Sequence, residues 1–407
     1  MLRSTLAAVA AIACALTVAA CGAGGSGGDV PIVVSVPVST EPWVAKSIQQ
    51  GAQLAVDDLN SRGGVRVGTA KKKLKLIVLD NGGSPANALA NARTAVADHA
   101  LALLTDGTGA ASVAAVTDPA SLPVFICFDG GAGLIDPKRF PTLFRMAPAD
   151  QTMAQHIADY IANSKPKVAL ITEDDDYGQQ GHAALQTALR QDRLQVVSDQ
   201  QVQQRATDVS TQVLAARRAG ANTLIVWAGA ANIAGVLSAT GSSGWNVRVI
   251  SSPTGEDPLV RQKLVAHKDW LQSLRFVSSR ITSELGPRPF NTFRAHFESA
   301  LGVTKVGVSQ DGRPVVQPPD WAMYPYDAVE LVAEAVDETG TLGPKLMRAM
   351  NSASIVGANG DSRGYNAGYH EGISPSDMYI AQFDGFVFEP ATDDHIAALL
   401  PKVNQLG

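Results

Sequence analysis

Polar or glycine-rich loops follow several apolar runs of the sequence, and these loops hold the residues that could bind a ligand or carry out a reaction. They are Gly107-Thr108-Gly109, Asp129-Gly130, and the acidic segment Glu173 to Asp176 with Tyr177 directly after it. Hydroxyl and backbone N–H groups bind anions, whereas carboxylates bind amines, hydroxyls or metal ions. Ligand binding is therefore the first chemistry to weigh.

The motifs of several enzyme classes are missing from the sequence. It contains no HExxH, CxxC or P-loop motif, and its GxSxG match, Gly24 to Gly28, lies in a glycine-rich run and is no nucleophile elbow. Its seven histidines form no cluster with metal-ligand spacing. Gly107-x-Gly109-x-x-Ser112 is a dinucleotide fingerprint without its final glycine, so it gives little support for a nucleotide, and Ser112 is expected to be structural. The acids from Glu173 to Asp176 lack the alternate spacing of a calcium loop, which favours solvated acids at a helix N-terminus. We expect no enzyme activity, no cofactor and no metal site.

The segment from Pro31 to Gly64 has the pattern of the elements that must position these loops. It opens with a β-branched apolar run, which is typical of a parallel strand buried on both faces. After a short polar loop, apolar residues recur at three- and four-residue steps, which predicts a helix that ends at Gly63-Gly64. Similar units recur about every thirty residues and predict doubly wound α/β sheets. Ligands of such sheets bind at the carboxyl ends of the strands, where the candidate loops lie.

The N-terminal residues have the pattern of an export signal. Arg3 precedes the apolar stretch Leu6 to Ala20, which is short for a membrane span. Val18-Ala19-Ala20-Cys21 looks like a bacterial lipobox, which predicts a lipoprotein signal peptide over 1–20 and lipidation of Cys21; an ordinary signal peptide is the alternative. Residues 21–29 then form a flexible tether. The expected location is extracytoplasmic, anchored to the outer face of the cell membrane, in the periplasm or at the cell surface.

Composition restricts the partners and the means of stabilisation. The chain carries 33 basic and 38 acidic side chains, and it has no basic patch interleaved with aromatic residues, so nucleic-acid binding has little support. Beyond Cys21 only Cys127 remains, inside an apolar run, which indicates a buried structural thiol. A single thiol forms no intrachain disulfide, so the fold must depend on its core.

The apolar strand, the polar loop and the segment GAQLAVDDLNSRGG together resemble the opening of type I periplasmic binding proteins, specifically the branched-chain amino-acid-binding (Leu/Ile/Val-binding) receptors of ABC transporters. Further similarities extend along almost the whole mature chain. The resemblance implies an α/β fold of two doubly wound, Rossmann-like lobes joined by a three-segment hinge, with crossings near 144–148, 274–279 and 355–365. Lobe 1 would comprise 30–146 plus 280–355, and lobe 2 would comprise 147–279 plus 356–407.

The same resemblance implies where a ligand binds between the lobes. Family members hold an α-carboxylate with hydroxyl and N–H groups, an ammonium with an acid, and cover the ligand with an aromatic ring. The carboxylate loop corresponds to Gly107 and Thr108, the covering ring to Tyr177, and the ammonium-binding glutamate to Thr254, with Glu256 two residues farther on. The full expected set is Trp43, Gly107, Thr108, Phe128, Asp129, Gly130, Tyr177, Ala230, Thr254, Trp321 and Tyr324.

Departures from the family pattern affect the expected ligand. Asp129 stands where the family has small and hydroxyl residues; its carboxylate would repel a ligand carboxylate and attract an amine, amide or hydroxyl, or it could cap a turn that begins at Gly131. Ala230 replaces a pocket tyrosine and leaves room for a larger ligand. Tyr177 could instead pack over a helix start, and each of the rings of Trp43, Trp321 and Tyr324 could pack within or between lobes.

The leading hypothesis is a monomeric, lipid-anchored solute receptor that closes its lobes over a small polar organic ligand. The receptor would deliver this ligand, an amino acid or a related compound, to the membrane subunits of an ABC permease. An amide, an amine or an aromatic compound is the runner-up ligand. The alternative function is a ligand-sensing module that acts through a membrane signalling partner.

Overall fold

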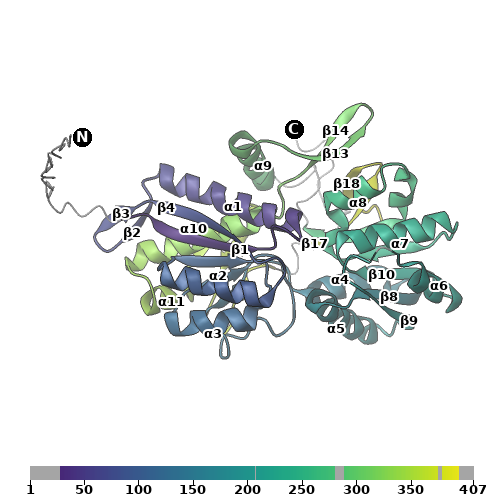
Figure 1. Ribbon diagram of the computed structural model, residues 1–407, viewed down its shortest axis with the longest axis horizontal. Coiled ribbons are helices and arrows are strands. Elements are labelled where there is room, and N and C mark those ends of the chain that lie inside the picture. The colour runs from purple at the N-terminus through teal and green to yellow at the C-terminus, as the bar shows by residue number, and fades with distance from the viewer. Residues whose placement is uncertain (1–27, 207, 280–287, 375–377, 394–407) are drawn as a thin grey trace, which may run out of the picture.

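The computed structural model describes residues 28–206, 208–279, 288–374 and 378–393, which form two α/β lobes side by side (Figure 1). The first lobe contains a five-stranded parallel sheet with the order β4-β1-β5-β6-β7. Its strands are β1 (Val30–Val36), β4 (Leu74–Asp80), β5 (Ala102–Thr105), β6 (Val124–Ile126) and β7 (Leu143–Arg145). The predicted signal peptide 1–20 and the lipidation site Cys21 lie outside the described residues.

Helices cover both faces of the first sheet because alternate residues of β1 point to opposite sides. Ile32 and Val34 pack in the core that contains α1 and α10, whereas Val33 packs in the core that contains α2 and α3. The apolar run that predicted a doubly buried strand is therefore confirmed. The first-lobe helices are α1 (Pro42–Ser61), α2 (Pro85–Ala97), α3 (Ala110–Ala120), α9 (Arg288–Leu301), α10 (Met323–Thr339) and α11 (Pro344–Met350).

The second lobe contains a seven-stranded sheet with the order β18-β17-β12-β11-β10-β8-β9, in which only the pairings of β17 and β18 are antiparallel. Its strands are β8 (Lys167–Glu173), β9 (Gln195–Val202), β10 (Thr223–Trp227), β11 (Arg248–Ser251), β12 (Leu274–Ser279), β17 (Met378–Asp384) and β18 (Val387–Pro390). Two separate cores fill the two faces of this sheet. The helices are α4 (Asp150–Ala162), α5 (Asp176–Gln191), α6 (Ser210–Arg218), α7 (Ala230–Ser242), η1 (Pro253–Glu256), α8 (Pro258–Lys263) and η2 (Lys268–Ser273).

A hairpin of β13 (Thr304–Gln310) and β14 (Arg313–Gln317) packs on the second lobe, although the sequence analysis assigned 280–355 to the first. Val306, Val308 and Val315 join a second-lobe core, and Gln262 of α8 donates a hydrogen bond to the carbonyl of Val306 (2.6 Å). The sequence pattern indicated no partner for this hairpin, whose valines need the apolar surface beside α8.

The chain also leaves the first lobe for the last time at a later residue than predicted. Residues 355–365 were expected to cross between lobes, but they lie within and around a hairpin of β15 (Ser354–Val356) and β16 (Ser362–Gly364) that packs on α10. A buried ion pair between Arg363 and Asp327 of α10 (3.2 Å) fixes it there. Gly372 still bonds to the backbone of Arg145, so the chain remains beside the first lobe to that point. A short hairpin of β2 (Val65–Val67) and β3 (Ala70–Lys72) completes the described elements.

In the part of the chain that the structure describes, every helix is too short or too polar to cross a membrane.

Candidate functional site

A cavity of about 630 Å³ lies between the two lobes, at the carboxyl ends of strands from both sheets. The first lobe lines it with Pro37, Thr40, Glu41, Val44, Gly83, Pro85, Asp106, Gly107, Thr108, Gly109, Ala110, Ala111, Ser112, Phe128, Asp129 and Leu134. The second lobe lines it with Glu173, Asp175, Asp176, Tyr177, Gln180, Gln204, Gly229 and Thr254. This is the position at which doubly wound sheets bind ligands.

The loop after β5 forms one wall of this cavity. Gly107 has a φ of 125°, and a Cβ at this position would lie 2.2 Å from the Cβ of Asp129, so only glycine fits. The Thr108 hydroxyl donates a hydrogen bond to Asp106, which also accepts one from the side chain of Asn81 (2.7 Å). The hydroxyl that was expected to bind a ligand carboxylate is thus already used as a donor.

Asp129 lies on the same wall, after β6. Its Oδ1 accepts a hydrogen bond from the backbone N–H of Gly131 (2.9 Å), so Asp129 caps a turn, which was one of the two alternatives for this residue. Its side chain also lines the cavity. Burial raises the pKa of Asp129 to about 6. Arg145 lies beneath it, where it donates to the carbonyl of Gly131 (2.8 Å) and pairs with Glu371 (3.1 Å).

Glu173 provides an acid on the second-lobe wall that the sequence analysis missed. It was placed among solvated acids at a helix N-terminus, but it is the last residue of β8 and only 3% exposed. Its carboxylate accepts hydrogen bonds from the N–H of Gly229 (3.0 Å) and from the amide of Asn232 (2.6 Å). Burial raises its pKa to about 7. Asp175, two residues on, does cap α5 by accepting from the N–H of Gly178 (2.8 Å).

Aromatic rings from both lobes meet at the cavity. The ring centroids of Phe128 and Tyr177 lie 6.2 Å apart across the lobes, and Tyr177 also lies 6.0 Å from Trp227 within its own lobe. Both interpretations of Tyr177 are therefore compatible with its position. Trp43 and Trp321 support Phe128 from behind, at centroid distances of 6.2 Å and 5.2 Å.

The structure brings part of the expected ligand-binding set to the main cavity and places the rest elsewhere. Gly107, Thr108, Phe128, Asp129, Tyr177 and Thr254 line the 630 Å³ cavity. Trp43 and Ala230 line a smaller neighbouring cavity of about 280 Å³. Gly130, Trp321 and Tyr324 line neither; Gly130 packs against Asp150, and the two rings are buried in the first-lobe core.

Glu256 does not take over the ammonium-binding role of the family's glutamate in this conformation. It is fully buried away from the cavity, and its carboxylate accepts hydrogen bonds from Ser278 (2.6 Å) and Gln317 (3.2 Å). Thr254 does reach the cavity, but its hydroxyl bonds to the carbonyl of Ala228 and to Ser252. The loop from Ser252 to Glu256 therefore supplies no free acid to a ligand.

Arg205 of the second lobe reaches across the mouth of the cleft. Its guanidinium donates to the backbone carbonyl of Thr40 and lies 3.5 Å from the carboxylate of Glu41, both in the first lobe. These contacts exist only while the lobes are close together. Arg205 was absent from the residues singled out in the sequence, because the partners are separated by 165 positions.

Replacing Arg205 by alanine is expected to weaken ligand binding about two- to fivefold, because a partly exposed charged contact that favours the closed form is lost. Isothermal titration with the ligand identified by screening would measure the change. Arg190→Ala, an exposed arginine on α5, is the matched control and should bind normally. Equal affinity of both variants would contradict a closing role for Arg205.

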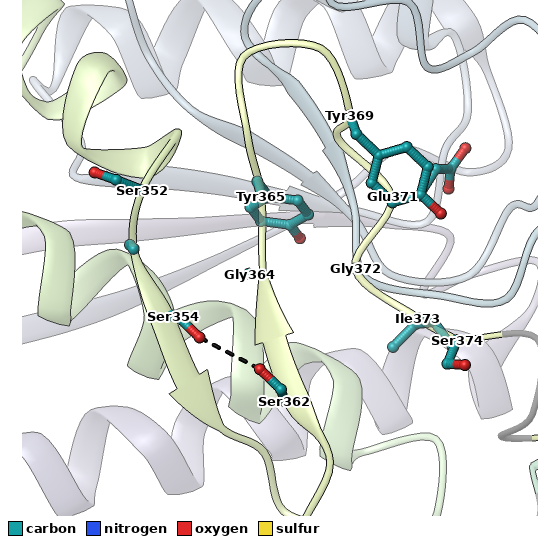
Figure 2. Close-up of a pocket in the computed structure, with 11 residues that line it drawn as sticks. Ser352, Ser354, Ser362, Gly364, Tyr365, Tyr369, Glu371, Gly372, Ile373 and Ser374 are labelled. Atoms are coloured by element: carbon teal, nitrogen blue, oxygen red, sulfur yellow. Dashed lines mark hydrogen bonds between the residues drawn. The ribbon is translucent and has the colours of Figure 1, made fainter.

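A second hollow, of about 470 Å³, lies between the β15–β16 hairpin and the segment around Glu371 (Figure 2). Figure 2 shows the hydroxyls of Ser354 and Ser362 in contact, at 3.4 Å. Among the described residues that line it, Glu371 is the only one of the Asp, Glu, Lys, Arg and His types, and its carboxylate pairs with Arg145. Charged groups converge in the interlobe cavity and not here. Across the described residues, no group of three or more His, Cys, Asp or Glu side chains is arranged to hold a metal ion.

Comparison with known proteins agrees with this arrangement. A family model described as periplasmic binding protein matches residues 30–387, and the chain therefore belongs to that family. This confirms the resemblance and the two-lobed type I fold, and the family is one of binding proteins rather than enzymes. No curated protein matches the sequence.

Several solved structures share the fold at low sequence identity. A type 1 periplasmic binding protein from Bordetella pertussis Tohama I has a TM-score of 0.78 at 18% identity, with 89% of this chain and 100% of that chain covered. LivJ from Streptococcus pneumoniae, in complex with isoleucine, has a TM-score of 0.74 at 18% identity, with 89% and 98% covered. A solute-binding protein of an ABC transporter from Rhodopseudomonas palustris BisB5, in complex with 3,4-dihydroxybenzoic acid, has a TM-score of 0.69 at 19% identity, with 92% and 99% covered.

Proposed function

We propose that this chain is the extracytoplasmic solute-binding protein of an ABC transporter and that it holds a small polar organic ligand in the 630 Å³ cavity. The observation that carries the proposal is the cavity itself, which is lined by loops of both lobes at the carboxyl ends of their sheets. A ligand bound there is contacted from both sides, so it stabilises the closed form over the open one.

Family membership and the relatives support the transport role. The similar structures include one in complex with isoleucine and one in complex with 3,4-dihydroxybenzoic acid, so proteins of this fold bind ligands of different chemistry. Delivery requires permease subunits that distinguish the closed lobes from the open ones. The lipobox-like Val18-Ala19-Ala20-Cys21 supports attachment of the receptor to the membrane through lipid on Cys21.

A thermal-shift screen of the mature protein tests ligand binding. Amino acids, amides, amines and aromatic acids are tested at about 1 mM, and a ligand present at 100 times its Kd is expected to stabilise the protein by about 2.7 kcal/mol. Small-angle scattering with the hit should then show a smaller radius of gyration, because the lobes close. Unchanged melting with the whole panel would count against the proposal.

The permease partner is tested separately by affinity capture from the native membrane. Recovery of ABC permease subunits is expected, and recovery of a membrane kinase or receptor in their place would favour the sensing function. Metabolic labelling with a fatty acid tests the anchor, and loss of the label in Cys21→Ser is the expected result.

A further inference from the structure

The interlobe cavity has a one-sided charge. Its lining includes six carboxylate side chains, of which only Glu41 pairs with Arg205 at the mouth of the cleft, and none of the described residues that line it is lysine, arginine or histidine. The six acids are Glu41, Asp106, Asp129, Glu173, Asp175 and Asp176. Acids that line the same cavity repel one another and an anionic ligand, most strongly where burial reduces screening by water.

Two of the helix N-termini at the cavity already carry acids. Such ends bind anions through their unpaired N–H groups, which would suit a ligand carboxylate. At α5, however, Asp175 accepts from the N–H of Gly178, and at the N-cap of α7, Glu173 accepts from the N–H of Gly229. The protein's own carboxylates occupy these two positions, which a ligand anion would otherwise use.

Two of the hydroxyl groups in the wall already use their hydrogen within the protein. A hydroxyl has one hydrogen to donate. Thr108 donates it to Asp106, and Thr254 bonds to the carbonyl of Ala228. Among the described residues, no group donates a hydrogen bond to Oδ2 of Asp129, whereas Oδ1 accepts one from the N–H of Gly131. A ligand that brings its own donors matches this wall.

Asp150 provides an observation that does not depend on the cavity lining. Its side chain is completely buried beside Asp129, and within the described part of the chain neither carboxylate oxygen has a hydrogen-bond partner. Arg145 is the nearby cation, but it pairs with Glu371. The carboxylates of Asp129, Asp150 and Glu371 thus share the guanidinium of Arg145. A buried carboxylate without a partner raises the free energy of the folded protein. A bound positive charge next to Asp129 would relieve this imbalance.

Aromatic faces complete the environment. The rings of Phe128 and Tyr177 come from opposite lobes and lie 6.2 Å apart at one side of the cavity. Aromatic faces attract ammonium and guanidinium groups, most strongly where water is excluded. Because the two rings belong to different lobes, their contact requires the lobes to be close together.

We propose that the ligand is an organic cation, an amine or guanidine whose charged nitrogen lies between Asp129 and Glu173 with the Phe128 and Tyr177 rings around it. This inference rests on the proposed solute-binding function and specifies the class of solute. It differs from the amino-acid pattern of the family, because the acid comes from the first-lobe loop after β6 and the anion-binding hydroxyls are engaged elsewhere.

Matched probes test this class directly. Putrescine, spermidine, agmatine and choline are compared in thermal shift and titration with neutral 1,4-butanediol, zwitterionic leucine, and the acids succinate and benzoate. Cations are expected to bind. Asp129→Asn keeps the acceptor for the Gly131 N–H but removes the charge, so it should weaken cation binding about tenfold or more. Glu173→Gln should act in the same direction.

The control is Asp98→Asn, the same change at an exposed acid after α2, which should leave affinity unchanged. If only neutral, zwitterionic or acidic probes bind, or if Asp129→Asn binds cations as the parent does, the cation class is overturned while solute binding stands. If no solute of any charge binds, the proposed function is overturned together with it.

Discussion

Gly178→Ala is expected to weaken ligand binding by more than about tenfold and to lower the free energy of unfolding by about 2 to 3 kcal/mol. Gly178 lies in the first turn of α5, where the helix starts against the end of β8. A Cβ there would lie 2.1 Å from the carbonyl oxygen of Glu173 and 2.6 Å from its backbone C and N atoms. Backbone atoms cannot move aside as a flexible side chain can, so the helix start must shift.

The shift acts on the binding site because Gly178 lies between its parts. Tyr177 precedes it in sequence, and Glu173 is the residue that the new methyl group would displace. Titration should therefore detect a loss of affinity of more than about tenfold, and urea unfolding should give the loss of stability. Gly368→Ala is the matched control, because a Cβ at this exposed glycine would have its nearest neighbouring atom, Oδ1 of Asn366, at 3.7 Å. Parent-like affinity in Gly178→Ala would show that the helix start tolerates the methyl group.

The fold could be predicted because its signals are local. The β-branched run at residues 32–38 predicts a strand buried on both faces, and β1 has helices on each side. The hairpin β13–β14 was assigned to the wrong lobe because strand patterning indicates a buried face but not which distant surface covers it.

The candidate site was only partly predictable for a similar reason. Positions just after strand ends were predicted to line the ligand site, and Thr108, Asp129 and Tyr177 do line the cavity. Glu173 was missed because an acidic run looks solvated in sequence, whereas its burial depends on where β8 ends beneath Gly229. Trp321 was expected at the cleft because it is aromatic and near a helix start, yet it packs behind Phe128. The direction in which a side chain points is a property of the packed fold.

Asp327 illustrates the same limit and leads to the second prediction. It lies on α10, and its carboxylate faces the β15–β16 hairpin. It lies 3.2 Å from Nε of Arg363 and accepts a hydrogen bond from the N–H of Ala358 (2.8 Å). Both charged side chains are at most 1% exposed. Burial raises the pKa of Asp327 to about 6, and the guanidinium opposes this effect.

Asp327→Ala is expected to lower the free energy of unfolding by about 3 to 5 kcal/mol, because it leaves the buried charge of Arg363 without its carboxylate. The matched control is Glu330→Ala on the same helix, which breaks the more exposed ion pair with Arg62 and should cost less than about 1 kcal/mol. Urea unfolding measures both changes.

A double variant separates the lost ion pair from lost packing. Arg363→Met removes the charge that Asp327→Ala leaves behind, so the combined variant should regain stability relative to Asp327→Ala alone. If the losses of stability from Asp327→Ala and Arg363→Met simply add in the double variant, the unpaired charge of Arg363 is not what destabilises Asp327→Ala. The hairpin precedes the segment that bonds to Arg145, and Arg145 contacts the loop of Asp129. Loosening this hairpin should therefore weaken ligand binding as well, even though neither residue lines the cavity.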